Sequence, residues 1–278
     1  MHNELFSIGP FTVYGYGLMT ALGIISAYLT ATYRSKKLGL DPERIFGLVI
    51  FCAVFGYASS KALYCITILP KILEDPSSFL TLATGWVVYG GIIGGIFGGW
   101  LYCRIKKIDF IAYFDMAIPS VALAQGFGRI GCFLAGCCYG LETDCPISIT
   151  FTHSEFAPNN VSLIPTQLYS SAFDFALAFF LMFLAKKTRK KGVIAAAYLV
   201  AYSTGRFVIE FFRGDLIRGS VGALSTSQFI AVFMIAAGVI LLIFSIKKAD
   251  ALAVDADAAA GADGRDNEPD CGDDAHEG

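Results

Sequence analysis

Long apolar runs, separated by short clusters of charged residues, dominate this chain of 278 residues and limit what it can fold into. The runs cover residues 11–33, 45–69, 79–103, 108–127, 165–185, 192–212 and 223–246. A bilayer core takes about 20 helical residues to cross, and the runs lack the strict alternation of barrel strands. The sequence therefore predicts an all-α integral membrane protein with about seven transmembrane helices. Only 16 % of the residues are charged, against about 25 % in a soluble domain.

The distribution of Lys and Arg predicts how the chain runs through the membrane. The connections after the first, third, fifth and seventh runs carry Arg34, Lys36, Lys37, Arg44, Arg104, Lys106, Lys107, Lys186, Lys187, Arg189, Lys190, Lys191, Lys247 and Lys248. The opposite connections carry only Lys71, Arg129, Arg213 and Arg218. Because basic loops are retained in the cytoplasm, we expect the N-terminus outside and the C-terminus in the cytoplasm.

This topology divides the chain into two parts. Residues 1–248 form the transmembrane domain, whose longest non-cytoplasmic segment lies at about 128–164. Residues 249–278 consist mainly of Asp, Ala and Gly, and their acidic residues far outnumber the single Arg265. Such a segment buries too little apolar surface to fold, so we expect a disordered acidic cytoplasmic tail.

The segment "GRIGCFLAGCCYG", Gly128–Gly140, places an arginine among glycines where the fourth run ends. Glycine permits non-helical backbone, which is tolerated at membrane depth only when it is buried in protein or lines a wet cavity. A close helix interface of small residues also explains the glycines, but it leaves Arg129 unexplained. A guanidinium matches phosphate oxygens in a two-pronged contact, so we expect Arg129 to lie beside an outward-facing cavity.

A second group of charged residues lies in "YSTGRFVIEFFRGD". Arg206, Glu210 and Arg213 are spaced by four and three residues, which puts them on one helical face. A buried Arg–Glu pair that only orients helices is one interpretation. However, this face carries more positive charge than Glu210 neutralises, so we expect an anionic ligand such as a phospholipid headgroup. Lys61, inside the second run, either joins this cavity or extends its amine to the headgroups.

Four of the eight cysteines, Cys132, Cys137, Cys138 and Cys145, fall on the predicted non-cytoplasmic side. An oxidising exterior favours disulfides there. A metal site built from Cys137, Cys138, Cys145 and His153 is an alternative, but the spacing is not a standard zinc pattern and we expect no bound metal. A redox site is a further alternative, although the chain offers no C-x-x-C pair in this segment.

These segments together resemble the prolipoprotein diacylglyceryl transferase family over most of residues 5–248. The segment "GRIGCFLAGCCYG" is similar to the family signature G-R-x-G-N-F-x-N-x-E-x-x-G. The segments "YGYGLM", "VVYGGIIGG", "PTQLY" and "GRFVIEFFRGD" follow in the family's order. Seven spans with the N-terminus outside is also the family's topology.

The resemblance implies a reaction and its partners. It implies a membrane-embedded transferase that moves the diacylglyceryl group of phosphatidylglycerol to the lipobox cysteine of preprolipoproteins, the first step of bacterial lipoprotein maturation. Residues 1–248 would then be the catalytic domain, in the bacterial plasma or inner membrane. We expect binding of phosphatidylglycerol and preprolipoprotein signal peptides, no nucleic acid, no cofactor and a monomer.

The resemblance also implies roles for particular residues. As catalytic residues it indicates Tyr16, Tyr89, Arg129, Arg206 and Glu210, and as substrate-binding residues Lys61, Arg129, Cys132, Gly140, Gln167, Arg206 and Arg213. Cys132, Ala135 and Cys137 stand where the signature has Asn, Asn and Glu. Tyr89 replaces a usual histidine, Lys61 a usual arginine and Ser170 a common glutamate.

Two other functions are compatible with the residues alone. One is a redox or metal-binding membrane protein on the same scaffold, with Cys132, Cys137, Cys138 and Cys145 active. The other is a transporter or lipid-binding protein without chemistry, because glycine-broken segments also occur in transporters. Arginine-dependent lipid labelling of a lipoprotein would distinguish the transferase from both.

Overall fold

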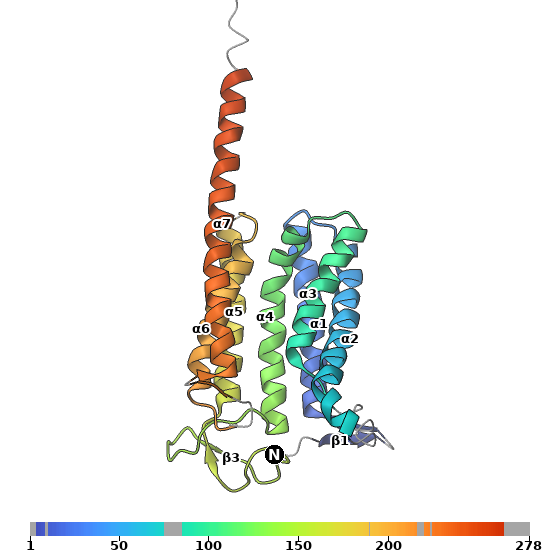
Figure 1. Ribbon diagram of the computed structural model, residues 1–278, viewed down its shortest axis with the longest axis vertical. Coiled ribbons are helices and arrows are strands. Elements are labelled where there is room, and N and C mark those ends of the chain that lie inside the picture. Colours follow the sequence, from blue (N-terminus) through green and yellow to red (C-terminus); the bar gives the residue numbers. More distant parts are fainter. Residues whose placement is uncertain are drawn as a thin grey trace, which may run out of the picture.

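The computed structural model of the protein describes residues 4–8, 11–74, 85–188, 190–215, 220–222 and 224–263. Within these residues lie α1 (Gly15–Lys37), α2 (Glu43–Glu74), α3 (Val88–Ile105), α4 (Phe110–Ala135), α5 (Thr166–Lys187), α6 (Val193–Glu210) and α7 (Thr226–Asp263). Three antiparallel hairpins join β1 (Glu4–Ile8) to β2 (Phe11–Tyr14), β3 (Ile149–Thr150) to β4 (Ser162–Leu163), and β5 (Ser220–Val221) to β6 (Leu224–Ser225). Figure 1 shows the helices standing side by side, with β1 and β3 beneath one end of them.

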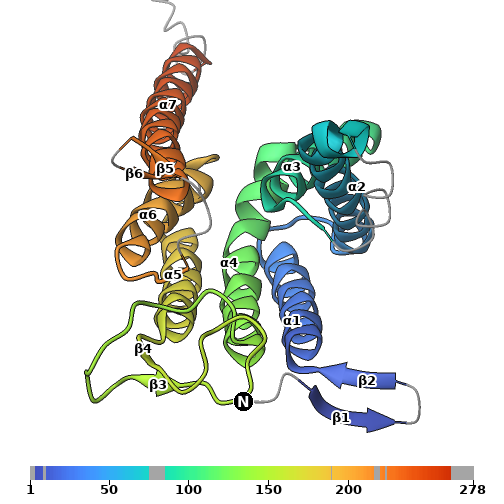
Figure 2. The same cartoon turned by 60° about the horizontal axis from the view of Figure 1, so that its bottom comes forward.

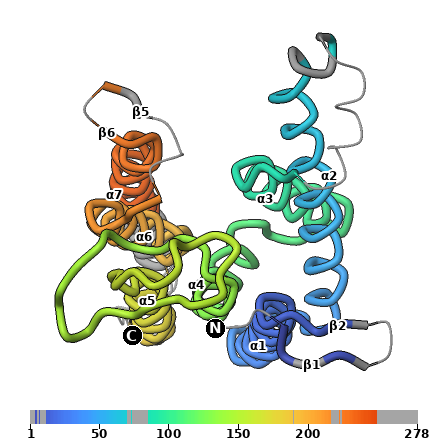
Figure 3. Tube along the Cα trace, turned by 90° about the horizontal axis from the view of Figure 1, so that it is seen from below, coloured from blue at the N-terminus to red at the C-terminus, as the bar shows by residue number. Residues whose placement is uncertain are grey.

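The central helix α4 joins the two halves of the bundle. It packs against α1 on one side and against α5 and α6 on the other, while α2 pairs with α3 and α6 with α7 (Figure 2). Buried apolar residues fill the spaces between these helices, for example Met116 between α1, α2, α3 and α4, and Ala122 between α4, α5 and α6. Seen from below, α4 lies between α1 and α5 (Figure 3).

The outer surfaces of the helices are apolar, as a lipid-facing surface requires. Large side chains such as Val54, Ile93, Phe179 and Phe233 are more than half exposed. Stretches in α2, α4, α5, α6 and α7 are each long and apolar enough to cross a bilayer. The described part of the chain is thus a helical, multi-pass membrane protein, in agreement with the sequence. Spans for α1 and α3 stay a prediction, since polar or glycine residues lower their hydropathy.

Several predicted boundaries were wrong. Residues 11–14 were assigned to the first span, but they form β2, because aromatic and β-branched residues favour a strand. The fourth span was expected to end near residue 127, but α4 continues to Ala135. Helix α7 continues to Asp263 into the predicted tail, where many alanines favour a helix. The rest of that tail, 264–278, lies outside the described residues.

Helix α4 ends where the sequence provides a left-handed residue. Gly136 caps the helix at φ +74°, and its N–H bonds back to the last turn of the helix. The N–H of Cys137 also donates to the carbonyl of Cys132, at 3.1 Å. Glycine is the residue best suited to this conformation. The turn leads into residues 136–165, which cover the helix ends and pack their own small core around Phe151.

Candidate functional site

Arg129 lies near the end of α4, in helical backbone. Of the glycines beside it, Gly131 serves close helix packing, since a Cβ on Gly131 would come within 3.2 Å of the Tyr16 ring of α1. The nearest ionic partner of Arg129 is Asp174 of α5, with Nε and Oδ2 3.9 Å apart. Within the described residues the guanidinium has no hydrogen-bond acceptor, so its donors remain available to a ligand.

Arg206 and Glu210, near the end of α6, form an ion pair, at 2.8 Å between Nη2 and Oε2. Both side chains are largely buried. Hydroxyl groups at the end of β6 and the start of α7 complete the pair: Ser225 donates to Glu210 Oε1 at 3.1 Å, and Arg206 donates to Ser227 at 3.4 Å. The predicted i, i+4 pair is thus confirmed, with further contacts from the next helix.

Arg213 follows α6 and is bound by two carboxylates. It contacts Asp215 at 2.8 and 2.5 Å, and its Nε lies 3.9 Å from Glu210 Oε2. The expected excess of positive charge on this face was therefore overestimated. Asp174 and Asp215 add two carboxylates to Glu210, and only Arg129 is left without a close acceptor among the described residues.

The three arginines gather at one end of the bundle. The Arg206 guanidinium lies within electrostatic range of both Arg129 and Arg213. Asp174 in turn lies within electrostatic range of Arg129 and Arg206. Helices α4, α5 and α6 therefore bring to one place charges that are distant in the sequence, as expected for the arginines. Asp174 was missed, although an ionisable residue inside the fifth apolar run was a usable signal.

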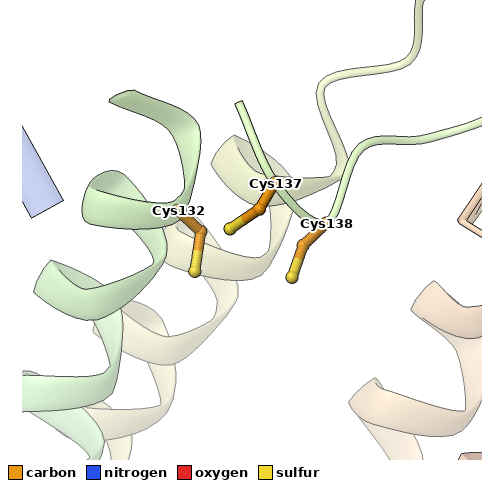
Figure 4. Close-up of side chains that lie close together, drawn as sticks. All are labelled: Cys132, Cys137 and Cys138. Carbon is orange, nitrogen blue, oxygen red and sulfur yellow. The ribbon is translucent and has the colours of Figure 1, made fainter. Parts of the chain in front are cut away.

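Three cysteines lie beside these arginines. The Sγ atoms of Cys132, Cys137 and Cys138 are all within 4.8 Å of one another. Figure 4 shows them facing a common space, Cys132 from α4 and the others from the following loop. Hydrogen bonding to its two neighbours raises the pKa of the Cys137 thiol. Arg129 lies within electrostatic range of Cys132 and Cys138.

The structure changes the expectations for these cysteines. Cys145 is exposed and, with His153, lies outside the cluster, so the four-residue metal site considered from the sequence is not assembled. No disulfide joins the cysteines that the structure describes. Tyr16 also belongs to this region, because its hydroxyl lies within electrostatic range of all three clustered thiols.

Gly140 and Gln167 hold the loop that carries the cysteines. Gly140 pairs with Arg213 in an isolated antiparallel bridge, and a Cβ on Gly140 would lie only 2.5 Å from the carbonyl oxygen of Ile164. Gln167 is 1 % exposed and donates to the carbonyl of Cys137 at 2.8 Å. These two predicted substrate-binding residues therefore contact the backbone around the site.

Lys61 and Tyr89 lie on the other pair of helices. The Lys61 amine is 4.4 Å from the centre of the Trp86 ring and donates to the carbonyl of Gly85 at 3.3 Å. Tyr89 begins α3 and is 42 % exposed. The described contacts connect neither residue to the arginines. A cavity of about 260 Å³ borders Tyr139, Gly140 and Gly214, next to the site.

The sequence is similar to those of known proteins over almost its whole length. The family profile described as "Prolipoprotein diacylglyceryl transferase" matches residues 3–244. A phosphatidylglycerol–prolipoprotein diacylglyceryl transferase of Clostridium tetani is 48 % identical over 248 residues, covering 89 % of this chain and 98 % of the relative. Transferase 2 of Clostridium perfringens is 45 % identical over 230 residues, covering 82 % and 90 %. The transferase of Staphylococcus haemolyticus is 30 % identical over 249 residues, covering 86 % of each.

Proposed function

The chain belongs to the prolipoprotein diacylglyceryl transferase family, and from this premise we propose how its residues carry out the reaction. The protein is a transferase that moves the diacylglyceryl group of phosphatidylglycerol to a prolipoprotein. The acceptor is the thiol of the lipobox cysteine in the signal peptide. A carbon–sulfur bond forms, the carbon–oxygen bond to the phosphate breaks, and glycerol phosphate leaves as the thiol loses its proton.

The observation that carries this mechanism is the position of Arg129. Its guanidinium has no close acceptor among the described residues, and Arg206 lies within electrostatic range of it. We assign the lipid phosphate to the space between these two side chains. Because guanidinium donors stabilise charge that develops on a leaving phosphate, the pair accelerates bond breaking as well as binding the lipid.

The surrounding carboxylates hold the arginines in place. Glu210 fixes Arg206 at 2.8 Å, and Asp215 fixes Arg213 beside it. Asp174, which is 2 % exposed, stands 3.9 Å from Arg129 and balances its charge without occupying its donors. Ion pairing of this kind keeps a guanidinium oriented while part of its fork stays free for phosphate.

The acceptor thiol must approach the same end of the bundle. Positive surroundings favour the thiolate, which is the attacking form. We assign Tyr16 and Cys132 to contacts with the lipid headgroup or the acceptor, because Cys132 lies within electrostatic range of Arg129 and Tyr16 within electrostatic range of Cys132. Tyr89 and Lys61 are assigned to the same reaction from the family resemblance, on the α2–α3 side. Gly140 and Gln167 support the site through the loop backbone.

The membrane placement follows from the distribution of charge. We propose seven spans in a bacterial plasma or inner membrane, with the N-terminus and the arginine site on the outer side. The basic residues that end α1, α3 and α5 then lie in the cytoplasm. We propose that the protein acts as a monomer.

The test is complementation of cells depleted of their own transferase, read by lipid labelling of a lipoprotein. We expect the intact chain to restore labelling and Arg129→Ala or Arg206→Ala to abolish it. Arg44→Ala is the matched control, since the only ion pair of Arg44 among the described residues is with the exposed Asp41, at the other end of the bundle. Undiminished labelling by both Arg129→Ala and Arg206→Ala would refute the assignment.

A further inference from the structure

We propose that Cys132, Cys137 and Cys138 form a binding site for one soft divalent metal ion of the zinc class, and that the bound ion blocks lipid transfer. This metal binding is separate from the transfer reaction of the family, for which we expected no metal. Its existence rests on the geometry of the thiols alone. Its effect on activity rests on the proposed role of Arg129.

The spacing of the sulfur atoms fits a single ion. A tetrahedral zinc ion binds thiolates at about 2.3 Å, which places its sulfur ligands about 3.8 Å apart. The three Sγ atoms already lie within 4.8 Å of one another. A movement of about 1 Å therefore closes the ligand set, leaving a fourth position for water. Soft thiolate ligands select zinc-like ions over magnesium or calcium.

The backbone around the thiols is held from two sides. The Cys137 N–H donates to the Cys132 carbonyl across the end of α4, at 3.1 Å. From α5, Gln167 donates to the Cys137 carbonyl at 2.8 Å and Thr166 to the Cys138 carbonyl at 2.9 Å. Both α5 side chains are almost completely buried. Ligands on supported backbone lose little freedom when they bind a metal.

The conformation of Cys138 is a second, independent sign. It has φ +62°, a left-handed value that is uncommon for a residue with a side chain. Such strain concentrates at functional sites. Figure 4 shows the Cys138 side chain lying close to the other two thiols. All three cysteines are only partly buried, so an ion can reach them.

The charge of the loaded site explains the block. Three thiolates and one divalent ion carry a net charge of −1, within electrostatic range of Arg129. This anionic centre competes with the lipid phosphate for the guanidinium that is otherwise open. Metal binding also occupies Cys132, to which we assigned a contact with the lipid headgroup or the acceptor. Removal of the metal returns neutral thiols and frees Arg129.

Binding is tested with Cd²⁺ on the purified, phosphine-reduced full chain in detergent. We expect one ion per chain and an ultraviolet thiolate-to-cadmium absorption band. The double variant Cys137→Ser/Cys138→Ser should lose more than about 100-fold in affinity, beyond the loss usual for outer-shell partners. Cys145→Ser is the matched control from the same loop and should bind like the intact chain. No band in the intact chain, or an equal band in the double variant, would overturn the proposal.

The effect on activity is tested with Zn²⁺ in the transfer assay. Zinc should inhibit the intact chain and Cys145→Ser, and a chelator should reverse the inhibition. The double variant should transfer lipid and resist zinc, and its melting temperature reports whether it is folded. Arg129→Ala should lose transfer but still bind Cd²⁺, so failure of the proposed reaction is distinguishable from failure of the metal site. Equal zinc sensitivity of the intact chain and the folded double variant would contradict the block.

Discussion

At the scale of single residues, the spacing between Arg129 and Asp174 shapes the chemistry of the site. A carboxylate in direct contact would occupy the donors that a phosphate needs, whereas one at 3.9 Å balances charge and leaves them open. Asp174 Oδ2 is buried and has no hydrogen bond in the described part of the chain. We therefore propose that Asp174 positions Arg129.

Replacing Asp174 tests this role. We expect Asp174→Asn to lower the transfer rate by about 100-fold, because a small displacement of a binding group costs about that much. The measurement is the initial rate of diacylglyceryl transfer over a range of phosphatidylglycerol concentrations. Ser170→Ala is the control on the preceding turn, since within the described residues its hydroxyl donates only to the Thr166 carbonyl of its own helix. An unchanged rate in Asp174→Asn would contradict the role.

Residue-scale inference from the sequence was strongest where the partners are close in the chain. Arg206 and Glu210 are separated by one helical turn, so their pairing followed from spacing alone. Asp174 and Arg129 lie on different helices, and no local pattern connects them. Asp215 was missed as a partner of Arg213 because it follows the end of α6, outside any helical spacing rule. The expected charge excess was wrong for that reason.

At the scale of elements, the ends of the helices position the site. Helix α6 begins against Asp115 of α4, which accepts from the N–H groups of Gly192 and Ala195 at 2.5 and 2.9 Å. A carboxylate at a helix N-terminus satisfies free donors and complements the helix dipole. This contact fixes α6 along α4, and so fixes Arg206 relative to Arg129 at the opposite end.

Removal of the Asp115 carboxylate should therefore destabilise the bundle. We expect Asp115→Ala to cost about 1–2 kcal/mol, as for the loss of a helix cap, and to lower the apparent melting temperature by about 2–8 °C. Thermal unfolding in detergent measures the change. Asp144→Ala, at an exposed position in the loop 136–165, is the control. Equal melting temperatures for the two variants would show that the contact does not stabilise the bundle.

Apolar periodicity located the helices but not all of their ends. Hydropathy does not distinguish an apolar strand from an apolar helix. It therefore could not separate β2 from α1, which follows it directly. The glycines of "GRIGCFLAGCCYG" suggested a broken helix, yet only Gly136 adopts a left-handed conformation within the segment 128–136. Whether a glycine breaks a helix or packs against a neighbour depends on the neighbour, here Tyr16 of α1.

At the scale of the whole molecule, two charged regions lie at opposite ends of the helix bundle. Basic residues end α1, α3 and α5 at one end, and the arginine site and the cysteine loop occupy the other. Alternating helix directions follow from the short connections between most neighbouring helices. In the proposed orientation, this arrangement would bring a lipid headgroup and an external signal peptide to the same membrane face.

The orientation is open to a direct test with an impermeant maleimide on intact cells. We expect a variant that retains only Cys145 to be labelled from outside, because Cys145 is exposed on the loop 136–165. A variant that retains only Cys271 should be labelled only after permeabilisation, since the acidic tail is predicted to be cytoplasmic. The reverse labelling pattern would invert the topology.

The central claim is that Arg129 and Arg206 act as one unit on one phosphate, and a double-mutant cycle of transfer rates tests it most directly. The rates of the intact chain, Arg129→Lys, Arg206→Lys and the double variant are compared at saturating acceptor. Lysine keeps the charge but loses the two-pronged contact, so residual rates should stay measurable. Residues acting as a unit give non-additive losses; we predict that the double variant is less impaired than the product of the two single losses. Losses that multiply in full would mean that the two side chains act at separate places, and the account would be wrong.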